Sequence, residues 1–119
     1  MPENTKHQRA HELVNENRLD EAVKLLSEAL VETETAELWN DWATLKIVLE
    51  QLKEAVAGYE RALELDPENA QVQFNLGVLM IQANKLHRGV ALLQQCNGRV
   101  TAQEQLAVNG LLQQYQNGA

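Results

Sequence analysis

The chain has 119 residues, 45% of them hydrophobic, and its formal net charge is −7. The length fits one domain, and the apolar content with only two prolines excludes a disordered or fibrous chain. The acidic balance argues against nucleic acid or an anionic membrane as the main partner, because both require clustered Lys and Arg.

The chain has one cysteine, which excludes an intramolecular disulfide and favours a reducing compartment, so we expect a cytoplasmic location. No apolar run reaches the length of about 18 residues that a bilayer span needs, and the polar start does not resemble a signal peptide.

The spacing of apolar residues predicts seven helices in chain order, at about 3–16, 19–32, 36–49, 52–65, 69–83, 86–96 and 102–116. Pro67 ends the fourth helix, because proline has no N–H and pushes Asp66 out of the helical region. Thr35 is placed to cap the third helix, and Thr101 with Glu104 forms a capping box before the last. The links are short, with Asn17 among the turn residues, so the pattern gives no sign of a second domain.

A small residue recurs at intervals of 33 and 34 residues, at Ala22, Ala55 and Gly89. The helix before each of these carries its own small residue, and the three are Ala10, Ala43 and Gly77. Two antiparallel helices approach closely only where neither carries a bulky side chain, so each pair predicts a tight helical hairpin. Hairpins repeated near every 34 residues are typical of a helical solenoid, in which each unit covers the apolar face of the next.

Residues 36–69 resemble a complete tetratricopeptide repeat (TPR). The matching positions are Trp39, Trp42, Ala43, Ala55, Tyr59, Ala62 and Pro67. Residues 70–101 match well, although Gln73 replaces the first aromatic residue, and residues 3–35 match mainly in their second half. The resemblance implies an all-α, right-handed solenoid of three helical hairpins, closed by a capping helix at about 102–116. We expect residues 1–119 to form one such domain.

In the family that the chain resembles, the first helix of each repeat lines a concave groove that receives a peptide or helix of a partner. The resemblance implies that the groove residues here are His7, His11, Asn15, Asn40, Thr44, Ile47, Val48, Phe74, Val78, Ile81 and Gln82. Some members of the family bind chaperone tails through a carboxylate clamp of Lys and Arg. Because the corresponding positions hold His7, His11, Asp41, Gln71 and Asn75, we expect no binding by that mechanism.

Three residues of the fifth helix, Phe74, Val78 and Ile81, form an apolar stripe separate from the side that carries Leu76 and Gly77. Because this helix has two apolar faces, we expect each face to pack against a different element or partner. The second face fits an apolar partner segment, the chain's own last helix folding back, or a homodimer contact. Phe74 is the first candidate for a binding hot spot.

The sequence shows no constellation typical of an enzyme. His7 and His11 have the i, i+4 spacing of metal ligands, but no third strong ligand is evident, so we predict a polar pair in the groove and no metal or cofactor. Cys96 stands at a small-residue position of its helix, which indicates packing rather than nucleophilic chemistry. Phosphate-binding loops and nucleophile elbows are missing from the sequence.

The predicted function is therefore that of a non-catalytic scaffold that binds a protein or peptide partner through apolar anchors. Two alternatives stay open. TPR units of this general look occur on bacterial glycosyltransferases and methyltransferases, so the chain could be an accessory or targeting module of a larger or associated enzyme. It could also be a self-assembling structural unit.

Overall fold

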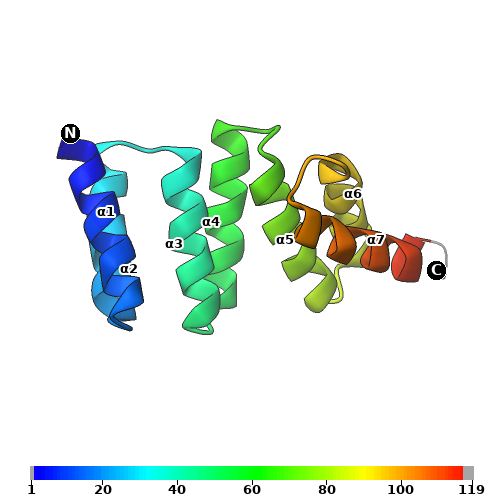
Figure 1. The fold of residues 1–119 in the computed structure, drawn as a ribbon, viewed down its shortest axis with the longest axis horizontal. Coiled ribbons are helices and arrows are strands. Elements are labelled where there is room, and N and C mark those ends of the chain that lie inside the picture. Colours follow the sequence, from blue (N-terminus) through cyan, green and yellow to red (C-terminus); the bar gives the residue numbers. More distant parts are fainter. Residues whose placement is uncertain (1, 117–119) are drawn as a thin grey trace. The chain divides into compact units, whose positions relative to one another are not determined.

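The structure is a computed structural model that describes residues 2–116, with the side chains of residues 5–115. The described part of the chain contains seven helices and no strand (Figure 1). Their bounds are α1 Pro2–Asn15, α2 Leu19–Glu32, α3 Ala36–Val48, α4 Leu52–Leu65, α5 Ala70–Gln82, α6 Leu86–Cys96 and α7 Ala102–Gln116. These bounds agree with the sequence prediction to within about one residue at each end, so the predicted helices are confirmed.

The chain divides into two compact units, Met1–Asp66 and Pro67–Ala119. The first contains the hairpins α1/α2 and α3/α4, and the second contains the hairpin α5/α6 with α7. The single domain expected from the sequence stays a prediction. None of the described helices is both long and apolar enough to cross a membrane.

The first unit is held together by apolar side chains from α1, α2 and α3. Its buried cluster consists of Ala10, Leu13, Ala22, Leu26, Ala29, Leu30, Leu38 and Leu45, with Trp39 and Trp42 packed against it. Ala22, Ala43 and Ala55 are fully buried, as expected for residues at which two helices meet. Gly58 of α4 extends this contact, since a Cβ there would lie 3.0 Å from the Ala43 Cβ and 2.8 Å from the Trp42 ring.

The second unit has an equivalent close approach between α5 and α6. A Cβ on Gly89 would lie only 3.0 Å from the backbone oxygen of Gly77, which is tighter than most Cβ contacts and favours glycine at this position. Gln73 is buried at the position where the repeat usually has an aromatic residue. Its amide is satisfied on both sides: Nε2 donates to the Pro67 carbonyl at 3.0 Å, and Oε1 accepts from the Arg99 guanidinium at 3.2 Å.

The three hairpin turns share one backbone conformation. Asn17, Glu50 and Asn84 each have φ of 62°, in the left-handed region. The next residue in each turn donates its backbone N–H to the carbonyl oxygen of the residue five positions before it, at 2.8 Å. This hydrogen bond is typical of the Schellman motif that ends a helix. Asparagine tolerates this conformation well, whereas Glu50 bears the strain of a side chain that rarely adopts it.

The predicted helix caps are also confirmed. The Thr35 hydroxyl accepts from the Leu38 N–H at 3.1 Å. At the start of α7, the Thr101 N–H donates to the Glu104 carboxylate and the Glu104 N–H donates to the Thr101 hydroxyl, at 3.1 and 3.2 Å. This reciprocal pair is the capping box predicted from the sequence.

Candidate functional site

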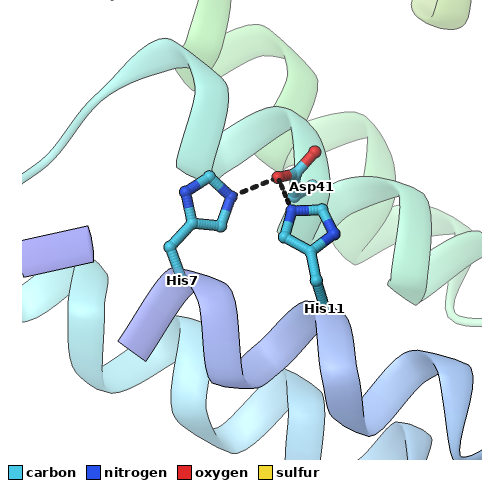
Figure 2. Close-up of side chains that lie close together, drawn as sticks. All are labelled: His7, His11 and Asp41. Atoms are coloured by element: carbon cyan, nitrogen blue, oxygen red, sulfur yellow. Dashed lines mark hydrogen bonds and ion pairs between the residues drawn. The ribbon is translucent and has the colours of Figure 1, made fainter. Parts of the chain in front are cut away.

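Two histidines of α1 and one aspartate of α3 meet on one side of the first unit (Figure 2). The i, i+4 spacing puts His7 and His11 on the same face of α1, with their ring centroids 4.9 Å apart. Asp41 Oδ2 lies 2.5 Å from His7 Nε2 and 3.4 Å from His11 Nε2. Because a carboxylate only accepts, His7 Nε2–H donates in the shorter contact. One carboxylate oxygen thus joins both imidazoles.

The three side chains differ in their contact with solvent. The His7 side chain is 15% exposed and that of Asp41 is 26% exposed, whereas His11 is 63% exposed. Glu37, one turn before Asp41 on α3, places its carboxylate 3.8 Å from Nδ1 of His7. His7 therefore lies between two carboxylates and is the most enclosed member of the cluster.

A pocket of about 150 Å³ lies beside this cluster. It is lined mainly by apolar groups, and its lining residues are Ala10, His11, Val14, Leu26, Asp41, Thr44 and Leu45. The Thr44 hydroxyl donates to the Asn40 carbonyl at 2.9 Å and shares a 2.8 Å hydrogen bond with the Tyr59 hydroxyl. The Thr44 hydroxyl thus already has hydrogen-bond partners within its own unit. Burial raises the pKa of Tyr59, and this phenol stays neutral.

A second hollow of about 240 Å³ lies on the first unit near the two tryptophans. Trp39 and Trp42 pack edge to face with centroids 5.3 Å apart. The Trp39 Nε1–H donates to Glu34 at 2.8 Å, and the Arg61 guanidinium holds the same carboxylate with two contacts of 2.7 Å. The hydrogen bonds from Arg61 and then from Trp39 lower the pKa of Glu34 from 4.5 to about 2. Val31 also lines this second hollow, and its side chain is 88% exposed.

In the second unit, the apolar stripe of α5 lies in one cluster with residues of α7, which agrees with one of the three contacts left open by the sequence, the chain's own last helix. Ile81 is only 8% exposed, and its side chain reaches the space that a Cβ on Gly89 would occupy. Phe74 and Val78 are half-buried against the cluster that contains Ile81. The cluster also takes in Val108, Leu111, Leu112 and Tyr115 of α7. A hydrogen bond of 3.0 Å from Gln71 to Glu104 joins the starts of α5 and α7. Much of this stripe thus faces the interior of its own unit.

Among the residues predicted to line a groove, the structure brings His7, His11 and Thr44 together at the cluster and the pocket. Asn15 and Gln82 are exposed, Val48 is 57% exposed, and Asn40 and Ile47 are half-buried. Whether these residues bind a partner stays a prediction. Sequence reasoning noted Asp41 only as a position without a cation, and missed its contact with both histidines.

Cys96 is fully buried in the second unit, and burial raises the pKa of its thiol. This placement agrees with the packing role expected from the sequence, because a buried neutral thiol is a poor nucleophile.

Comparison with known proteins addresses the fold. Residues 49–83 match the family model described as a TPR repeat. Comparison with curated protein sequences found no match. A crystal structure of the Yersinia enterocolitica type III secretion chaperone SycD, in complex with a peptide of the translocator YopD, is similar with a TM-score of 0.87 at 12% identity. The match covers 97% of this chain and 92% of that chain.

Two further solved structures are similar. The TPR2B domain of yeast Sti1, in a structure described as its pHsp70 complex, has a TM-score of 0.83 at 16% identity and covers 98% of both chains. A tetratricopeptide repeat protein from Parabacteroides merdae has the same TM-score and identity, and the match covers 98% of this chain and 46% of that chain. The resemblance noted from the sequence is confirmed: this chain carries a tetratricopeptide repeat and has the all-α helical-hairpin fold of tetratricopeptide-repeat proteins.

Proposed function

We propose that this chain is a non-catalytic scaffold that binds a peptide or helix of a partner protein, and that the pocket at α1 and α3 receives one apolar anchor side chain of that partner. The observation that carries the proposal is the pocket itself, since it is apolar and includes His11 and Thr44 from the predicted groove positions. A rigid site of this kind loses little conformational entropy when a partner binds.

The size of the pocket favours a side chain over a small-molecule ligand. Sites for cofactors and drug-sized ligands commonly enclose about 300–1,000 Å³, whereas this pocket encloses about 150 Å³. Helical partners present apolar anchors at i, i+3, i+4 and i+7, so one anchor would enter the pocket while its neighbours contact the surrounding surface. Val14, 36% exposed, lies in the lining and offers part of that apolar contact.

The peptide complexes among the similar structures support this class of function. SycD is described with a peptide of YopD, and the Sti1 domain is described in a complex with pHsp70. This chain has no Lys or Arg at the five positions where the clamp-type members of the family carry them. We therefore propose recognition through apolar anchors rather than through a terminal carboxylate.

A matched pair of valine substitutions tests the pocket. Val14 and Val31 each stand one residue before the last residue of their helix, so Val14→Lys and Val31→Lys make the same chemical change in equivalent helical settings. Peptides selected from a random-peptide display library on the wild-type chain would be measured against all three proteins by fluorescence anisotropy. Loss of one buried apolar contact is worth about 1.5–3 kcal/mol, so Val14→Lys should weaken binding by about tenfold or more.

Val31→Lys should leave the affinity unchanged. If both variants lose affinity equally, or only Val31→Lys loses affinity, the pocket is not the site that binds the peptide. Failure to select any peptide would count against the scaffold function itself.

Phe74 provides a separate test in the second unit. We propose that the part of Phe74 that is not covered by its own unit contributes to partner binding or to self-association. If Phe74→Ala leaves both peptide affinity and sedimentation behaviour unchanged in a folded protein, Phe74 has no such role. A concentration-independent monomer would exclude the self-assembling alternative.

A further inference from the structure

The geometry points to a binding site for one divalent transition-metal ion, with His7, His11 and Asp41 as its protein ligands. Each of the three residues offers one ligand atom, and these atoms all lie within 4.8 Å of one another. Two imidazoles and one carboxylate are a donor set found in zinc and non-haem iron sites. This inference goes beyond the proposed peptide binding, and it shares two residues with it, because His11 and Asp41 also line the pocket proposed for the anchor side chain.

One distance between ligand atoms already matches what a tetrahedral ion needs, a second is shorter, and the third, between the two histidines, is within 4.8 Å. Bonds of about 2.0–2.1 Å to nitrogen and oxygen place neighbouring ligand atoms about 3.3 Å apart. His11 Nε2 and Asp41 Oδ2 are already 3.4 Å apart, while His7 Nε2 and Asp41 Oδ2 are 2.5 Å apart. An ion would take the place of the proton that His7 donates, and the shorter pair would open by somewhat less than 1 Å.

The backbone restricts the cluster while leaving room for that adjustment. His7 and His11 are held one turn apart on α1, and Asp41 comes from α3 in the same compact unit. The exposed His11 ring can turn to complete the ligand set, since 63% of its side chain is open to solvent. Three protein ligands would leave a fourth coordination position for water or for a group of a partner.

Glu37 is placed to supply the outer contact that ligand histidines commonly have. A histidine that binds a metal through one nitrogen usually donates its other N–H to a carboxylate, which fixes the ring. Glu37 Oε1 lies 3.8 Å from His7 Nδ1, on the side away from Asp41. A small rotation of the exposed Glu37 side chain brings it into hydrogen-bonding range, so we assign Glu37 as a positioning residue.

The donor set also selects among cations. Imidazole nitrogen favours Zn²⁺, Ni²⁺, Cu²⁺ and Fe²⁺, whereas Mg²⁺ and Ca²⁺ require several oxygen ligands. We therefore expect binding of Zn²⁺ and of its spectroscopic substitute Co²⁺, without competition from Mg²⁺ at equal concentration.

The test uses the untagged, chelator-treated full chain. Calorimetric titration with Zn²⁺ should show saturable binding of one ion per chain. Titration with Co²⁺ should give an absorption band that Zn²⁺ abolishes. His7→Gln, His11→Gln and Asp41→Asn should each weaken Zn²⁺ binding by more than about tenfold, because removal of even an outer contact of a ligand costs about 10–100-fold. His87→Gln is the matched control, since it removes an exposed histidine of α6 that lies outside the cluster.

Glu37→Gln should weaken binding by about tenfold, with the Co²⁺ band retained at saturation. Far-UV circular dichroism verifies that each variant is folded. The assignment is overturned if the wild-type chain gives no saturable signal, if His87→Gln weakens binding as much as the cluster variants do, or if Zn²⁺ binds only between two chains with one ion per dimer. A cluster that never takes up Zn²⁺ or Co²⁺ is a hydrogen-bonded trio and no metal site.

Discussion

Two glycines of the second unit allow the close approach of α5 and α6 to be measured. Gly89→Ala adds a Cβ that would lie 2.8 Å from the Ile81 Cδ1 and 3.0 Å from the Gly77 carbonyl oxygen. Gly110→Ala adds the same atom on α7, where no atom beyond the adjacent residues and the nearby backbone of α7 itself lies within 4 Å. The two substitutions thus make an identical chemical change in helices of one unit, and only the first meets packed neighbours.

The expected magnitudes follow from two opposing effects. Replacing glycine by alanine in a helix stabilises the folded state by up to about 1 kcal/mol. At Gly89 the Ile81 methyl can move but the Gly77 carbonyl belongs to the backbone, so overpacking should cost about 1–3 kcal/mol. Gly110→Ala should therefore raise the free energy of unfolding by up to about 1 kcal/mol, while Gly89→Ala should lower it or leave it unchanged. The two variants should differ by about 1–3 kcal/mol.

Thermal unfolding followed by far-UV circular dichroism measures this difference. For a chain of 119 residues, an unfolding entropy of about 2.1 cal/mol/K per residue converts 1 kcal/mol into a shift of about 4 °C in Tm. The variants should thus unfold about 4–12 °C apart, with Gly110→Ala the more stable. Equal stabilisation by both substitutions would refute the reasoning, because it would show that the α5/α6 contact does not require glycine at this position.

Three further outcomes are expected. Glu50→Asn should stabilise the chain by about 0.5–1 kcal/mol in urea unfolding, because asparagine tolerates the φ of 62° at this turn; a loss of stability would contradict that view. The pKa of Glu34 is lowered from 4.5 to about 2 by Arg61 and Trp39, so its stabilising effect is present above about pH 4.5 and is lost as the pH falls towards 2. Glu34→Gln should flatten the dependence of Tm on pH in that window, and an unchanged dependence would count against the ion pair. Cys96 should react with a thiol reagent only after unfolding, and rapid labelling of the native chain would show that its burial is wrong.

Local signals account for the parts of the fold that could be predicted. A cap, a helix-ending proline or a turn asparagine acts within a few residues, so Thr35 and the Thr101–Glu104 box were found where the sequence placed them. Periodicity on the scale of a repeat gave the hairpins and their small-residue contacts. Glu50 was not recognised as a left-handed turn residue, because its side chain carries no signal for that conformation.

The contacts of the α5 stripe could not be predicted by the same means. The spacing of Phe74, Val78 and Ile81 shows that they share a face, but it does not show which element covers that face. The answer depends on how close α5 and α6 come, which lets Ile81 extend towards Gly89, and on the path of α7. The α5–α6 distance and the path of α7 both depend on tertiary packing. The sequence pattern of the stripe was therefore compatible with several different covering elements.

The histidine and aspartate cluster could have been found from the repeat itself. His7 and Asp41 are 34 residues apart, which is the length of one repeat. Equivalent positions on the first helices of adjacent repeats become neighbours when hairpins stack, because each helix is set beside its predecessor in nearly the same orientation. A cluster in such a protein can therefore combine residues at i and i+4 of one helix with a residue at about i+34 in the next repeat. A search confined to local spacing sees only His7 and His11 and misses Asp41, the group that makes metal binding chemically reasonable.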